Sequence, residues 1–238
     1  MILRRHIAVR RRARAFTLIE LLVVVAIIAL LLSILLPTLR NARMQAKIVV
    51  VHADLRQVCT ALDAYLMDNR DRLPPTRMGC ALGVECQLPA ELAKERYLNP
   101  PPVDVRTPQA WFPDLFQPAH TYRYRAPGAV WYNGEFYDFP DQPYRPRSWI
   151  WVPEDFPHCE SEEMQCYRKL RDEPPCPVVY AVWSVGPDLD SPKFPRIDGA
   201  QVDESRFPLP KAYWLHGSGD TGLITHFRSS RGPLYTSP

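Results

Sequence analysis

The sequence lacks the short motifs by which common catalysts are recognised. It contains no G-x-S-x-G, no H-E-x-x-H and no phosphate-binding glycine-rich loop. It also has no C-x-x-C pair, and its histidines show no metal-ligand spacing with the cysteines, which argues against a zinc site. These absences favour a protein that is not an enzyme.

Acidic residues are absent from the first 15 positions, which hold six of the 29 basic residues. The six are Arg4, Arg5, Arg10, Arg11, Arg12 and Arg14. The rest of the chain therefore has 23 basic and 26 acidic residues, so the formal charge of +3 is an effect of this basic leader and gives no indication of nucleic-acid binding. By the positive-inside rule, the same arginines should hold the N-terminus in the cytoplasm.

Polar residues are scarce in residues 16–36, where the exceptions are Thr17, Glu20 and Ser33. At about 1.5 Å per helical residue, this stretch spans roughly 31 Å, which is the thickness of a bilayer core. We therefore expect residues 16–36 to form a transmembrane helix and everything after them to lie outside the cytoplasm.

Glu20 is a misfit in such a helix, because a charged side chain at the bilayer centre costs about 2.5–3.5 kcal/mol on insertion scales. If the chain were cut between Ala15 and Phe16, the new amino group would be a cation about one helical turn from Glu20. The chain's own amine would point along the helix axis, so the amine of a neighbouring chain is the better partner. This geometry predicts that Glu20 acts in assembly, by pairing with the amine of a neighbouring chain.

Three simpler interpretations explain the N-terminus less well. A secretory signal peptide ends in an A-x-A-like cleavage site, and none follows Leu36. A twin-arginine signal, suggested by Arg11-Arg12, needs such a site too and does not account for Glu20. A plain membrane anchor explains the length and the basic flank but leaves Glu20 without a reason.

The stretch from Arg14 to Leu22 closely resembles the N-terminus of the superfamily of type IV pilins and type II secretion pseudopilins, with its basic leader, cleavage site, Phe-Thr-Leu-Ile-Glu and long apolar helix. The resemblance implies that a prepilin peptidase cuts before Phe16 and methylates its amine, and that Glu20 pairs with the amine of an adjacent subunit. It also implies other pilin-like subunits and an inner-membrane assembly machinery as partners. The residue before the cut is usually Gly, so Ala15 departs from the pattern.

Pro37 closes the apolar stretch, and its missing N–H predicts a kink in the helix. Beyond it, apolar residues recur at steps of three and four up to Leu66, with charged residues between them. We expect one helix over residues 16–69, whose amphipathic continuation over residues 37–69 is the spine of a globular head. Pro74-Pro75 ends this helix.

The head is expected to comprise residues 70–238. Of the 26 prolines, 25 lie between Pro74 and Pro238, which excludes long helices there and predicts extended loops around a small sheet. Candidate strands cover residues 121–125, 129–132, 148–152, 178–185 and 223–227, and candidate short helices cover residues 89–97 and 161–171. The predicted fold is α+β, with the long N-terminal helix packed on a small antiparallel sheet that has long proline-rich loops.

Two stretches of the head resemble the major pseudopilins of type II secretion. They are Tyr122-Arg123-Tyr124 followed by Pro127-Gly128, and the run from Tyr180 to Asp188 with its Ser-x-Gly-x-Asp turn. In those proteins the loop after this turn can bind calcium, which implies Asp188 and Asp190 as candidate Ca²⁺ ligands. The alternative is a solvated turn, because Gly-Pro-Asp is a common way to leave a strand.

The six cysteines allow disulfides if the head lies in an oxidising compartment. Cys80 with Cys86 and Cys159 with Cys166 are the local candidates, although sequence does not fix the connectivity. The alternative is that some are reduced core residues, Cys59 on the helix above all.

Together these features predict a single-pass protein of the inner (cytoplasmic) membrane with a cytoplasmic N-terminus and a periplasmic or extracellular head. We interpret it as a pilin-like filament subunit, and the Ser-x-Gly-x-Asp turn favours a type II secretion pseudopilin. The six tryptophans support a different hypothesis, a membrane-tethered protein whose aromatic face binds carbohydrate or peptide. Core packing is the commoner fate of tryptophan.

Overall fold

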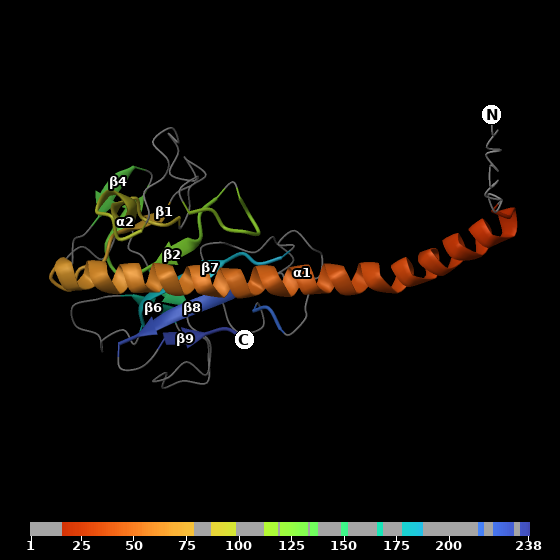
Figure 1. The fold of residues 1–238 in the computed structure, drawn as a ribbon. Coiled ribbons are helices and arrows are strands. Elements are labelled where there is room, and N and C mark those ends of the chain that lie inside the picture. Colours follow the sequence, from red (N-terminus) through yellow and green to blue (C-terminus); the bar gives the residue numbers. More distant parts are fainter. Residues whose placement is uncertain are drawn as a thin grey trace, which may run out of the picture. The chain divides into compact units, whose positions relative to one another are not determined.

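The computed structural model describes residues 16–78, 87–98, 112–118, 120–132, 134–137, 149–151, 166–168, 178–187, 214–216, 221–230 and 234–238. In this part of the chain a long helix, α1 (Leu18–Asp68), precedes nine short strands and a one-turn helix, α2 (Glu91–Lys94) (Figure 1). The chain divides into two compact units, Met1–Met44 and Gln45–Pro238, and α1 contributes to both.

Helix α1 is 51 residues long and continues through Pro37. No glycine occurs before Gly79, so Pro37 is the one strong helix breaker in this segment. The helix ends where Arg70 and Asp71 adopt left-handed φ angles of 55° and 59°, and the Asp71 N–H donates to the Leu66 carbonyl oxygen at 3.0 Å, as in a Schellman cap. These bounds agree with the expected helix over residues 16–69 to within two residues at each end, while the kink at Pro37 stays a prediction.

The main sheet of the head has four antiparallel strands in the order β2-β7-β8-β9. These strands are β2 (Arg123–Arg125), β7 (Val178–Ser184), β8 (Ile224–Ser229) and β9 (Leu234–Thr236). β7 is the longest strand, and six of its seven residues are buried. Its run of β-branched and aromatic residues suits a central strand, since such side chains pack well on a pleated surface.

Two smaller sheets complete the described part of the head. β1 (Thr76–Met78) pairs in parallel with β3 (Val130–Tyr132), β3 pairs antiparallel with β4 (Glu135–Tyr137), and β5 (Trp149–Trp151) pairs antiparallel with β6 (Cys166–Arg168). The five candidate strands therefore correspond to β2, β3, β5, β7 and β8. The α+β class, with a long N-terminal helix and an antiparallel sheet, is confirmed.

The helix predicted over residues 161–171 is wrong where the structure describes it. Residues 166–168 form β6, because pairing with β5 satisfies their backbone groups and overrides local helix propensity. The helix predicted over residues 89–97 shrinks to the single turn of α2, after which Arg96 adopts a left-handed φ of 65°. Strands β1, β4 and β9 were missed, since a three-residue strand leaves almost no alternating pattern to read.

The core of the head lies between the second half of α1 and the main sheet. Val51, Leu55, Val58 and Leu62 of α1 are all completely buried. Their spacing of three and four places them on one stripe of the helix, as the amphipathic pattern predicted. From the head, the completely buried partners include Tyr122, Tyr124, Val130, Tyr180, Val182 and Phe227.

Candidate functional site

Glu20 closes a hydrogen-bonded cap at the start of α1. Glu20 Oε2 accepts from the Thr17 N–H at 2.9 Å and from the Thr17 hydroxyl at 2.8 Å, while the Glu20 N–H donates to Thr17 Oγ1 at 3.3 Å. This reciprocal pattern is a capping box, which satisfies two backbone donors that a helix start leaves free. The T-x-x-E spacing was readable in the sequence, but the sequence interpretation did not assign Thr17 this role.

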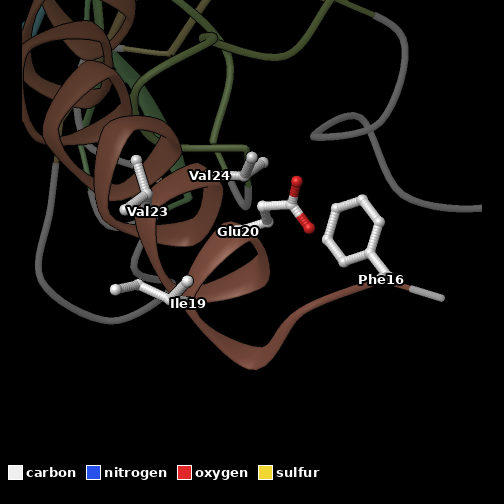
Figure 2. A pocket seen from close by; sticks show the side chains of 5 residues that line it. All are labelled: Phe16, Ile19, Glu20, Val23 and Val24. Carbon is white, nitrogen blue, oxygen red and sulfur yellow. The ribbon is translucent and has the colours of Figure 1, made fainter. Parts of the chain in front are cut away.

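The surroundings of Glu20 are apolar. Phe16, Ile19, Val23 and Val24 line an open hollow with it, and Figure 2 shows the Glu20 carboxylate turned towards the Phe16 ring. Among the described residues, every hydrogen bond to this carboxylate ends on Oε2, and no ion pair involves Glu20. Oε1 therefore retains its full capacity to accept a hydrogen bond from another group.

The other polar side chains of the apolar stretch satisfy themselves on their own helix. The Ser33 hydroxyl donates to the Leu30 carbonyl oxygen at 2.7 Å, and just beyond Pro37 the Thr38 hydroxyl donates to the Leu35 carbonyl oxygen at 2.8 Å. Such back-bonding hides a hydroxyl from a surrounding apolar medium. Glu20 is thus the residue of this stretch whose polar capacity the helix does not use up.

The stretch around Glu20 also fits a membrane by length and composition. α1 is the one helix in the described part of the chain that is long and apolar enough to cross a bilayer, and its most apolar window has no buried residues. The large apolar side chains are exposed on all sides of it, with Leu18 at 80% and Leu31 at 60%. A helix that is apolar all round needs an apolar environment to cover it.

Tyrosine hydroxyls of the sheet attach the second half of α1 to the head. The Tyr122 hydroxyl donates to Asp54 Oδ2 at 2.7 Å, and the Tyr180 hydroxyl lies 3.0 Å from both the Cys59 carbonyl oxygen and Asp63 Oδ1. Burial raises the pKa of both tyrosines, which keeps them neutral donors. Because one bond joins α1 to Tyr122, directly before β2, and the other to Tyr180 of β7, these contacts fix how far α1 can slide along the sheet.

A buried carboxylate that sequence reasoning missed organises the end of β7. Asp114 Oδ1 accepts from the Ser184 hydroxyl at 2.7 Å and from the Phe116 N–H at 2.9 Å, and Asp114 Oδ2 accepts from the Val185 N–H at 3.2 Å. Burial raises the pKa of Asp114, although these hydrogen bonds and Arg123 oppose the shift. The bond to the N–H two residues ahead is an Asx turn, and Pro113-Asp114 was its sequence signal.

The turn that follows β7 requires glycine. Gly186 has a φ of 65°, and a Cβ on it would lie 1.7 Å from the Gly222 carbonyl oxygen. Gly222 in turn approaches the backbone of Leu215 so closely that a Cβ would lie 2.5 Å from its nitrogen. The Ser184-Val185-Gly186 part of the predicted turn is therefore built as a tight, buried junction between two loops.

The structure describes only some of the remaining candidate residues. Ala15, Asp188, Asp190, Cys80, Cys86 and Cys159 lie outside the described residues, and of Cys166 only the backbone in β6 is described. Calcium binding and both disulfides therefore stay predictions. Cys59 is confirmed as a free, buried cysteine, and burial raises the pKa of its thiol to about 12. Within the described residues, no three His, Cys, Asp or Glu side chains gather as a metal site.

Comparison with known proteins gives a consistent result. Residues 10–36 match the model of the prokaryotic N-terminal methylation motif. The type II secretion system core protein G of Pseudomonas aeruginosa is 33% identical over 123 residues, which are 50% of this chain and 78% of that protein. The protein of the same name from Escherichia coli is 34% identical over 97 residues, covering 39% of this chain and 66% of the relative.

A pilus protein is similar over a shorter length. The type IV wide pilus major component PilA4 of Thermus thermophilus is 48% identical over 59 residues, covering 25% of this chain and 45% of PilA4. No solved structure matches the chain. Since the relative from P. aeruginosa is matched over more than two thirds of its length, the chain belongs to the pilin and pseudopilin superfamily, and within it to the family of type II secretion system core protein G, a pseudopilin.

Proposed function

We propose that this pseudopilin is made as a precursor, cut by a prepilin peptidase between Ala15 and Phe16, methylated on the Phe16 amine, and assembled into a filament through α1. The single observation that supports this proposal is the state of Glu20, a carboxylate in an apolar hollow with Oε1 free of partners among the described residues. A charged group in such surroundings needs a counter-ion. The amine of an adjacent subunit would supply it.

The capping box adds a physical detail to this proposal. In the isolated chain, Thr17 donates two hydrogen bonds to Glu20 Oε2 and none to Oε1, so the carboxylate, which accepts about four hydrogen bonds when ionised, is only half satisfied. A neighbouring amine can bind Oε1 without breaking the box. The box would then hold the carboxylate in place for the incoming subunit, and lateral packing of the apolar helices would supply the attraction.

The proposal extends to the location of the parts of the chain. Residues 1–15 are the leader, residues 16–36 cross the inner membrane with the N-terminus in the cytoplasm, residues 37–69 continue the helix, and residues 70–238 form a head outside the cytoplasm. The partners are other pilin-like subunits, the prepilin peptidase and the inner-membrane assembly machinery. A tethered carbohydrate- or peptide-binding protein is not favoured, because the relatives are named as secretion-system and pilus components.

Processing is tested by expressing the full chain with and without a prepilin peptidase and measuring its mass. The expected result is loss of the first 15 residues and addition of a methyl group only when the peptidase is present. Ala15→Gly should be cut at least as well, whereas Ala15→Leu should be cut poorly because the site needs a small residue. A chain that keeps its leader with an active peptidase would contradict the proposal.

Assembly is tested with Glu20→Gln, which keeps the size of the side chain and removes its charge. The fraction of processed chain recovered in filaments should fall at least tenfold, since an amide cannot neutralise an ammonium group. Ser33→Ala is the matched control, because Ser33 bonds only to its own helix among the described residues, and it should assemble as the wild type does. Equal assembly of Glu20→Gln and the control would remove Glu20 from its proposed role.

A further inference from the structure

A pair of histidines joins α1 to the main sheet at a place that the assembly chemistry does not use. His52 Nδ1 of α1 lies 3.0 Å from His226 Nε2 of β8, and the two ring centroids are 5.3 Å apart. His226 is completely buried, and His52 is half-buried. Two imidazoles at this distance share one hydrogen bond, in which one ring donates and the other accepts.

The surrounding groups favour one arrangement of protons. His52 also interacts with the Pro238 backbone, and if its Nε2 is the nitrogen that donates there, its Nδ1 is the acceptor towards His226. His226 Nε2 then carries the proton that is donated to His52. This leaves His226 Nδ1 as a bare nitrogen, in agreement with its lack of any hydrogen-bond partner among the described residues.

A second proton on His226 would have no hydrogen-bond acceptor among the described residues. It would create a buried N–H at Nδ1 that no described group accepts, and it would place a positive charge in a dry interface. The charges that face the pair from α1 and β8 are Arg56, which repels a positive charge on either ring, and farther along the interface Arg228, whose Nε lies 3.5 Å from Asp63 Oδ1.

The two strands that flank β8 bring no charge to the pair. They place Val182 of β7 and Thr236 of β9 opposite His226 in the sheet. The Pro238 backbone beside His52 favours a positive charge on that ring, but burial and Arg56 outweigh it.

We propose that the His52–His226 pair is a pH-sensitive latch, which fastens α1 to the sheet while both rings are neutral and is weakened when the pair takes up a proton whose charge the buried interface does not compensate. Burial, with a smaller effect from the neighbouring positive charges, lowers the pKa of His226 to about 3 and lowers that of His52 as well. The folded state thus binds fewer protons than the unfolded state, in which histidine has its ordinary pKa near 6.5. The latch therefore stabilises the head fully above about pH 6.5 and progressively less as the pH falls below it.

The first test measures thermal unfolding of the full chain in detergent between pH 7.5 and 5.0. The Tm of the wild type should fall by about 4 to 8 °C more than that of the double variant His52→Gln/His226→Gln, which keeps a hydrogen-bonding pair but cannot titrate. His216→Gln, at an exposed histidine of the same unit, is the control and should keep the wild-type pH dependence. An identical fall of Tm in the wild type and the double variant would overturn the proposal.

A second measurement needs no variant that must fold. In an NMR titration of the wild-type chain, the His226 ring should not titrate above pH 5, and acidification to pH 5 should speed hydrogen exchange of the α1 amides around His52, after correction for the intrinsic rate. A His226 ring that titrates near 6.5 while these amides stay protected would show that a protonated pair fits the interface, and the latch would not exist.

Discussion

The two halves of α1 share one continuous helical backbone but differ in composition and in surroundings, since the first half is almost entirely apolar and the second mixes apolar with charged residues. In the first half, apolar residues cover every side and are exposed, with Leu18 at 80%. In the second half, Leu55 and its neighbours on one stripe are completely buried against the sheet, while the opposite side carries charge. The difference shows that one continuous helix can pass through two environments, because both the number of apolar residues and their distribution around the helix decide what each half packs against.

The largest effect is expected at Cys59, which lies in the buried half of α1. Because burial raises the pKa of the Cys59 thiol to about 12, its thiolate fraction at pH 8 should be about a thousandfold below that of an ordinary cysteine. Alkylation of the native chain in detergent at pH 8, read for this cysteine by peptide mass spectrometry, should be slower by about that factor than in denaturant. Protection of less than tenfold would mean that the second half of α1 is not closed against the sheet.

The next largest effect is expected from truncating a buried leucine. Leu55→Ala should lower the free energy of unfolding of the head by about 2–5 kcal/mol, because it leaves a cavity in a completely packed interface. Leu31→Ala makes the same chemical change in the exposed half and should leave the unfolding of the head nearly unchanged. Denaturant titration of the full chain in detergent measures both, and equal losses would contradict the division of α1 into two environments.

A smaller effect is expected from the hydrogen bonds that fix the helix on the sheet. Tyr122→Phe keeps the ring and removes the donor to Asp54, so the head should lose about 1.5–3 kcal/mol of stability, the range for a hydrogen bond to a charged group. Tyr132→Phe is the control, since Tyr132 is 39% exposed, and it should change stability by less than about 0.5 kcal/mol. The idea that Tyr122 sets the register fails if both variants unfold at the same denaturant concentration.

The smallest effect should come from the outer side of the buried half. Val49 is 67% exposed although it stands between Ile48, which is buried, and Val51, which is completely so. Val49→Ala should therefore shift the free energy of unfolding of the isolated chain by no more than about 0.5 kcal/mol. A loss above 1 kcal/mol in the same denaturant titration would show that this side is covered within the monomer.

An element could be predicted from the sequence when the residues that determine it lie close together in the chain. The helix could be predicted because its signals, the apolar stretch, the three-and-four spacing and Pro74-Pro75, lie within one element. The long strands β7 and β8 could be predicted for the same reason. β6 was mistaken for a helix because its state depends on pairing with β5, about 17 residues earlier in the chain.

The site divides in the same way. Glu20 stood out as a charge in an apolar stretch, and its Thr17 partner is three residues away, so both lie within the reach of sequence reasoning. Asp114 and the His52–His226 pair were missed. Asp114 binds Ser184, 70 residues later, and the two histidines are 174 residues apart. A single sequence contains no signal for which of several aspartates or histidines will meet.

The amino-acid sequence by itself determined the long helix, its apolar first half and the position of Glu20 in it, because helix formation and apolarity are local properties of the chain. Only the tertiary structure decided which strands the apolar stripe of the second half packs against, which tyrosines and carboxylates hold it, and that two distant histidines share one hydrogen bond. These contacts join segments far apart in the chain, and their partners are selected by the way the whole head packs.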